Sequence, residues 1–216
     1  ATLTLRKSWT NAIVNNAVNL PATTGFTNNT ALFNSVANTT TETDTGVSVT
    51  VFAGETGTLT AEAFTVGSAA NYNATLTCTG NATALAGNSL TVSAADTAIV
   101  CTYSNTRLQS TLRLAKAWGA NSIAGNVASI GATTGLTNNT ALFTSTASTN
   151  TNGAFVTVFA GETATLPAET MTTGSLANYT TALACDNGVT PSGANGQASN
   201  TVTIAAANAG QAITCT

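Results

Sequence analysis

The chain has 216 residues, of which 43% are hydrophobic, enough to form cores, while only 6% are charged and the net charge is −3. It has no histidine and only five scattered basic residues, which excludes the usual proton shuttle, the commonest metal ligand and a basic surface for nucleic acid. No apolar run approaches the ~20 residues of a membrane-spanning helix, and the abundant Thr, Asn and Gly favour strands joined by turns.

The first predicted strand is ATLTLRKSW, at residues 1–9. Side chains alternate between the two faces of a strand, so Lys7 shares a face with Leu5 and Trp9. A buried ammonium group without a partner is costly. We therefore expect the lysine either to pair with an acid or to reach solvent at the end of the strand.

Another strand pattern, VSVTVF at 47–52, leads into AGET, a predicted turn that contains Glu55. Glu62 follows on what should be the strand leaving that turn, which makes it the better acidic partner for Lys7. It is out of phase with the apolar residues before it. We therefore expect a β-bulge at this point, which would turn the carboxylate inward.

The last strand of the first half is AIVCTYSNTR, at 98–107, and its alternation places Cys101 and Asn105 on one face. Each half of the chain holds one cysteine pair and no histidine. This pattern indicates disulfides, Cys78–Cys101 and Cys185–Cys215, in place of a metal site. On the loop-entropy model each would stabilise its domain by roughly 3–4 kcal/mol.

The second half of the chain repeats the first. Three blocks recur almost unchanged: 25–35 as 135–145, 49–59 as 156–166, and 67–78 as 174–185. Turn-rich stretches at 39–46 and 148–154 separate the strand patterns, and no segment has a sustained helical period. The sequence therefore predicts an all-β protein with two tandem β-sandwich domains, residues 1–107 and 108–216.

The repeat carries the lysine and the acid into the second half as Lys116 and Glu169, with Pro167 at the expected bulge. The asparagine has no counterpart, because the second half stops at Cys215 and Thr216 where the first continues as YSNTR. The last strand of the second domain is therefore incomplete. We expect either an excerpt from a longer array or a strand supplied by another molecule, since an open sheet edge invites strand addition.

The order LTLRKSW, VTVFAGETGTLTAEAF, NYNATLTC and CTYSNTR resembles the prealbumin-like, CNA-B or SpaA-type Ig-like repeats of bacterial surface proteins, over nearly the whole of each half. The resemblance implies Ig-like β-sandwiches in the stalks of adhesins and pilins. In many members a lysine of the first strand and an asparagine of the last form an isopeptide bond, assisted by an acid. Lys7, Asn105 and Glu62 match these residues, and three states stay open: the covalent bond, a non-covalent cluster, or solvent-reaching lysines.

Together these observations predict a structural, extracellular protein of a bacterial cell surface, in a stalk, adhesin, pilus or filament, whose partners are neighbouring repeats or copies of itself. The alternative is a binding module that recognises a glycan, or a host or abiotic surface, through its Thr-rich faces or loops such as 186–200. No nucleophile–base pair, phosphate loop or cofactor fingerprint is present. We therefore expect no enzymatic activity, no cofactor and no metal.

Overall fold

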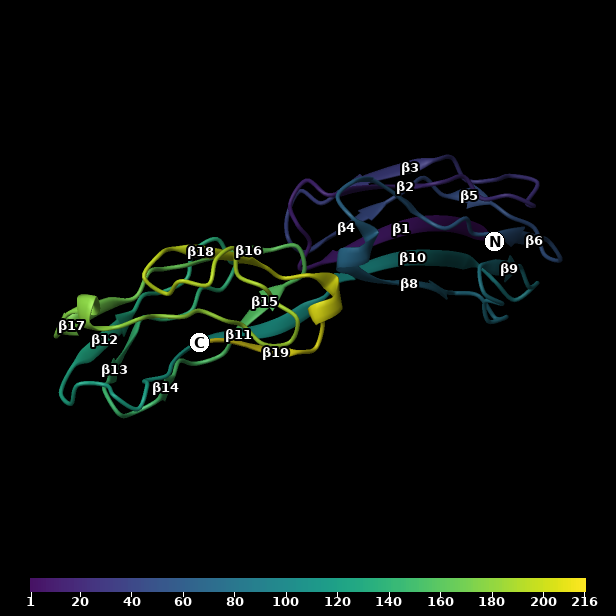
Figure 1. Cartoon of the computed structure of the whole chain (residues 1–216). Coiled ribbons are helices and arrows are strands. Elements are labelled where there is room, and N and C mark those ends of the chain that lie inside the picture. The colour runs from purple at the N-terminus through teal and green to yellow at the C-terminus, as the bar shows by residue number, and fades with distance from the viewer. The chain divides into compact units, whose positions relative to one another are not determined.

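Strands make up nearly all of the regular structure, which confirms the all-β prediction. The structure is a computed structural model that describes residues 1–216. The chain divides between Arg107 and Leu108 into two units, Ala1–Arg107 and Leu108–Thr216 (Figure 1). The helices are three single turns of 3-10 type: η1 (Ala69–Asn71), η2 (Leu176–Asn178) and η3 (Ala206–Asn208). No helix is long or apolar enough to cross a membrane.

The first unit is a sandwich of a large sheet and smaller ones. Its strands are β1 (Thr2–Thr10), β2 (Ala17–Leu20), β3 (Phe33–Val36), β4 (Glu42–Thr45), β5 (Val49–Thr50), β6 (Thr56–Thr58), β7 (Ala63–Val66), β8 (Tyr72–Thr79), β9 (Ser89–Thr91) and β10 (Ala98–Arg107). The large sheet has the order β4-β1-β10-β8, with β5 also paired to β1. The second layer contains β3-β2-β7 and the pair β6-β9 (Figure 1).

The core of the first unit lies between these layers. Leu3, Leu5 and Trp9 of β1 are fully buried and pack with Val18 of β2 and Ile99 of β10. This burial follows the period-two alternation of the sequence, because one face of each strand meets the opposite layer. β1 and β10 are parallel neighbours in the middle of the large sheet, so the first and last strands of the unit run side by side.

The second unit repeats the arrangement with fewer and shorter strands. They are β11 (Gln109–Lys116), β12 (Val127–Ile130), β13 (Phe143–Thr146), β14 (Thr151–Asn152), β15 (Val156–Phe159), β16 (Thr163–Leu166), β17 (Thr170–Thr173), β18 (Asn200–Thr203) and β19 (Ala212–Cys215). β14 and β15 pair with one side of β11, and β19 pairs with the other side in parallel. The remaining sheets are β13-β12-β17 and β16-β18. The segment 179–184, the counterpart of most of β8, forms no strand.

Two predicted local structures differ from those observed. The turn-rich stretches at 39–46 and 148–154 each contain a short strand, β4 and β14, at the edge of the large sheet. These stretches contain Asp and Asn, which have low strand propensity, as well as Thr, which favours strands. The local pattern therefore indicated a turn. Pairing with the long central strand β1 or β11 overrides that preference.

Candidate functional site

Lys7 lies in the core of the first unit, with its side chain 0% exposed. Its Nζ donates a hydrogen bond to Oε2 of Glu62 at 2.5 Å and lies 4.6 Å from the centroid of the Trp9 ring. Burial lowers the pKa of Lys7 to about 8, although the Glu62 carboxylate acts in the opposite direction. A fraction of this amine is therefore neutral and nucleophilic near neutral pH.

Glu62 reaches Lys7 from an irregular link, residues 59–62, that joins β6 to β7. The prediction that Glu62 lies on a strand with a bulge is wrong in this detail. A strand would alternate, whereas the irregular link lets both Leu59 and Glu62 turn toward the core. The register irregularity of β7 lies farther on, opposite Ala17 and Val18 of β2.

Asn105 lies on β10, where its side chain is on the same face as Lys7. Lys7 is in register with Tyr103, and Asn105 is two residues farther along, in register with Trp9. Asn105 is 1% exposed, and neither its amide nitrogen nor its amide oxygen has a hydrogen-bond partner. Leaving buried polar atoms unpaired costs about 1–3 kcal/mol per group, so this amide is destabilising unless it reacts or gains a partner.

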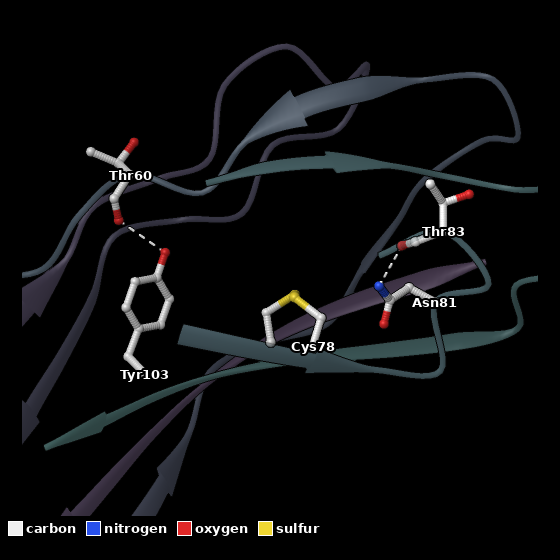
Figure 2. The surroundings of a disulfide bond; sticks show 6 residues. Thr60, Cys78, Asn81, Thr83 and Tyr103 are labelled. Atoms are coloured by element: carbon white, nitrogen blue, oxygen red, sulfur yellow. Dashed lines mark hydrogen bonds between the residues drawn. A yellow bond between two sulfur atoms is a disulfide. The ribbon is translucent and has the colours of Figure 1, made fainter. Parts of the chain in front are cut away.

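Tyr103 connects the strand that carries Asn105 to the link that carries Glu62. Its hydroxyl donates to the backbone oxygen of Thr60 at 2.9 Å, and Figure 2 shows the ring pointing toward that carbonyl. Burial, and then the charge of Glu62, raise the pKa of Tyr103 to about 12. The phenol therefore stays protonated and keeps donating, which holds the acid-bearing link against β10.

Each unit contains one disulfide. Cys78–Cys101 joins β8 to β10 at directly opposed positions, next to Tyr103 in Figure 2. The Cys185–Cys215 disulfide joins β19 to the end of the irregular stretch that precedes residue 186. The same two residues also form an isolated antiparallel β-bridge. Both disulfides tie the last strand of a unit to its neighbour on the side away from the first strand.

The second unit contains the same lysine–acid pair in a more open setting. Nζ of Lys116 lies 3.0 Å from Oε1 of Glu169 and 4.7 Å from the centroid of the Trp118 ring. The side chain of Lys116 is 16% exposed. Glu169 lies in the link between β16 and β17, as Glu62 does between β6 and β7. β19 ends at Cys215, and the position that corresponds to Asn105 in the repeat falls after Thr216, outside residues 1–216.

Other polar residues have structural roles that the sequence patterns did not reveal. Glu55 accepts hydrogen bonds from the backbone N–H groups of Phe52 and Thr27, so the predicted AGET turn also holds a second loop. Ser35 accepts from Trp9 Nε1 and donates to Asp44 at 2.6 Å, which fixes the indole. Asp44 could not be singled out from the sequence, because its stretch indicated a turn. No cluster of three or more potential metal ligands is present.

Residues 108–216 match the sequence profile of the prealbumin-like fold domain. No curated protein matches the chain. Among solved structures, the Bacillus anthracis TIE protein aligns with 9% identity and a TM-score of 0.40, over 99% of this chain and 33% of that protein. The chain thus spans about a third of the length of the TIE protein.

The major pilin of Streptococcus pyogenes aligns with 13% identity and a TM-score of 0.41, over 100% of this chain and 97% of the pilin. A point mutant of the same pilin gives 12% identity and a TM-score of 0.39 over the same shares.

Proposed function

The chain belongs to the prealbumin-like fold domain family, and from that membership we propose that it is a structural, extracellular repeat protein of a bacterial surface stalk, adhesin or filament. Its partners are neighbouring repeats or further copies of the protein. In the first unit, Lys7 and Asn105 form an intramolecular amide crosslink with the help of Glu62. The protein acts as a stable spacer and not as an enzyme.

The observation that carries the crosslink is the buried, unpaired amide of Asn105 beside a buried lysine–glutamate pair. A non-covalent cluster would be expected to hydrogen-bond that amide, since buried polar groups nearly always have partners. Here both amide atoms lack one, and Lys7, the amine on the same face, has a lowered pKa. Reaction removes the ammonium group and the unpaired amide nitrogen at once.

The reaction is a transamidation. Neutral Nζ of Lys7 attacks Cγ of Asn105, the new N–C bond forms, and the Cγ–Nδ2 bond breaks. Glu62, protonated by the transfer of the lysine proton, donates to the departing nitrogen, which leaves as ammonia. No oxidant or cofactor is needed. The product joins β1 to β10, the strands through which the chain enters and leaves the unit.

Such a crosslink suits a stalk because of where it lies. A pulling force on the chain enters the first unit through β1 and leaves through β10. With Lys7 bonded to Asn105, the force passes directly between those strands, and the residues between them cannot be extended. Closing a loop of about a hundred residues would also stabilise the unit by roughly 4–5 kcal/mol on the loop-entropy model.

Intact-mass spectrometry tests the proposal. The purified chain should be lighter than its sequence mass by the two hydrogens of each disulfide and by one ammonia. Lys7→Ala, Glu62→Gln and Asn105→Leu should each restore the ammonia mass, while Lys116→Ala, the matched control in the second unit, should not. If the wild-type chain lacks the ammonia deficit, Lys7, Glu62 and Asn105 form only a non-covalent cluster. If the deficit persists in Lys7→Ala, a lysine other than Lys7 forms the bond.

The alternative function, a module that binds a glycan or another surface, has a separate test. Specific, saturable binding to a glycan array by the two-unit chain would support it. Assembly of copies by strand addition would need an unpaired sheet edge that accepts a strand from another molecule.

A further inference from the structure

The large sheet of the first unit has two edges that differ in chemistry. At one edge, β4 is four residues long and contains Glu42 and Asp44. At the other edge, β8 is eight residues long and pairs with β10 and with no other strand (Figure 1). β8 contains no charged residue and no proline, and its register with β10 has no bulge. Short length, charges, prolines and bulges are what prevent sheet edges from pairing, so β8 is the unprotected edge.

The disulfide of the first unit shows which backbone groups of β8 point away from the sheet. Cys78 lies directly opposite Cys101, and their Cα atoms are 4.0 Å apart, the close spacing of a pair without backbone hydrogen bonds. The equivalent disulfide of the second unit has the same Cα spacing. There the flanking residues Ala184 and Thr216 exchange both backbone hydrogen bonds, as this pattern requires.

Hydrogen-bonded and non-hydrogen-bonded pairs alternate along two antiparallel strands. The backbone groups of Ala74, Leu76 and Cys78 therefore point to the open side of β8, and we call them the free edge. None of these groups makes a backbone hydrogen bond elsewhere in the chain. Ala74 is exposed and Leu76 is half-buried, although both lie on the inward face of the strand. Three N–H groups, three C=O groups and a strip of apolar surface are thus available to one further strand.

We propose that the free edge of β8 pairs antiparallel with the free edge of a second copy of the chain, which joins the two large sheets into one. Leu76 then lies opposite Leu76 of the second copy, and Ala74 lies opposite Cys78. All the backbone groups of both free edges are paired in this register. The interface rests on the proposed function and deepens it, because it names the surface through which copies of the protein meet.

A second copy fits this edge because β8 is complementary to itself. In the register centred on Leu76, two leucines meet on the inward face, and Thr75 of one copy lies opposite Thr77 of the other on the outward face. Apolar and Thr–Thr pairs across neighbouring strands are stabilising. No like charges meet, since β8 has no charged residue. A charged partner segment would gain nothing from this edge, whereas identical edges related by a two-fold axis form a closed pair.

The contact is small, which sets the expected affinity. The eight residues of β8 span about 26 Å, and one strand from each copy falls short of the roughly 1,200 Å² that stable complexes bury. We therefore expect the separate chains to dimerise weakly. Copies held side by side on one surface or filament have a high effective concentration, which strengthens such a contact without new interactions.

Sedimentation velocity and hydrogen exchange followed by NMR test the inference on the full 216-residue chain. We expect monomers at micromolar concentration and dimers toward the millimolar range. In the dimer the amides of Ala74, Leu76 and Cys78 should become protected from exchange. Those of Thr75 and Thr77, which already bond to β10, should be protected at every concentration. Association through a face of the sheet would not produce this alternation.

Two double variants at exposed positions of β8 check the register. Thr75→Lys with Thr77→Lys places like charges opposite each other and should weaken dimerisation about 3–10-fold. Thr75→Lys with Thr77→Glu places opposite charges across the interface and should strengthen dimerisation by a similar factor. Both effects should shrink at high salt. Because the two variants alter the same two side chains, a loss of folding cannot explain effects of opposite sign.

The opposite edge of the same sheet provides the matched control. Thr43→Lys with Thr45→Lys adds the same charge at two exposed positions of β4. This variant should dimerise as the wild type does. If it weakens dimerisation as much as the two lysines on β8, net charge and not the edge controls association, and the inference is overturned.

The remaining outcomes also decide the question. A chain that stays monomeric in the millimolar range, or a dimer that the two lysines on β8 leave intact, would overturn the inference. Protection of Ala74 and Leu76 that does not depend on concentration would overturn it in favour of pairing within one chain. The intact mass of the chain does not depend on dimerisation. The proposed crosslink can therefore fail while this interface stands, and the reverse.

Discussion

The two units contain the same lysine–acid pair but differ in what covers it. In the first, β1 and β10 pair over nine positions, and Lys7 is completely buried. In the second, β11 and β19 pair over four positions, and Lys116 is partly exposed. The pair itself therefore forms without the asparagine-bearing strand. In the first unit β10 contributes to the burial of Lys7 and supplies the amide, the two conditions that the proposed crosslink requires.

The largest expected effect on the stability of the first unit comes from removing its buried amide. Asn105→Leu keeps a side chain of similar size but prevents the crosslink, so we expect the first unit to lose about 4 kcal/mol of unfolding free energy. Its calorimetric transition should move down toward that of the second unit. Lys116→Ala serves as the control. An unchanged transition for Asn105→Leu would mean that the first unit has no crosslink to lose.

Removing each disulfide also tests how the two units differ in stability. Because β19 is short, we expect the double variant Cys185→Ala with Cys215→Ala to lose about 3–4 kcal/mol and to unfold the second unit selectively. The matched variant Cys78→Ala with Cys101→Ala should leave the first unit folded, since the extensive β1–β10 pairing and the proposed crosslink would remain. Hydrogen exchange resolved by unit measures both. Equal protection of the two units in their respective variants would contradict this ranking.

The smallest expected effect is a pH dependence confined to the uncrosslinked first unit. In Asn105→Leu, Lys7 keeps its amine, whose pKa is about 8 in the folded unit, against an ordinary value of 10.5 for a lysine in water. Between these values the unfolded chain binds more protons, so stability should rise with pH, by about 2 kcal/mol from pH 8 to pH 10. Above pH 10 the raised pKa of Tyr103 acts in the opposite direction.

Denaturant titrations at several pH values measure this dependence. In the wild type, where the proposed crosslink would remove the titrating amine of Lys7, the free energy of unfolding should not change over the same pH window. A rise of equal size in the wild type would show that the amine is still free.

The internal repeat, the period-two alternation and the paired cysteines were enough to predict the all-β class, the inward face of Lys7 and Asn105, and the disulfide partners. These features depend on short-range geometry, since a strand exposes alternate side chains to opposite faces wherever it lies. Each repeated block also supports the assignment of its copy. For the same reason the short edge strands were missed, because their pairing depends on a neighbour and not on their own residues.

Tertiary structure decided the rest. The sequence singled out Glu62 as the acidic partner of Lys7, but only the fold shows how the carboxylate gets there, because an irregular link before β7, and not a bulged strand, turns this out-of-phase residue inward. Only the packing around Asn105 leaves its amide buried and unpaired. Which residues share a face follows from the order of residues along each strand. Which of them meet, and whether water reaches them, depended on the strands that lie across the core, since burial and pairing are properties of contacts between segments far apart in the chain.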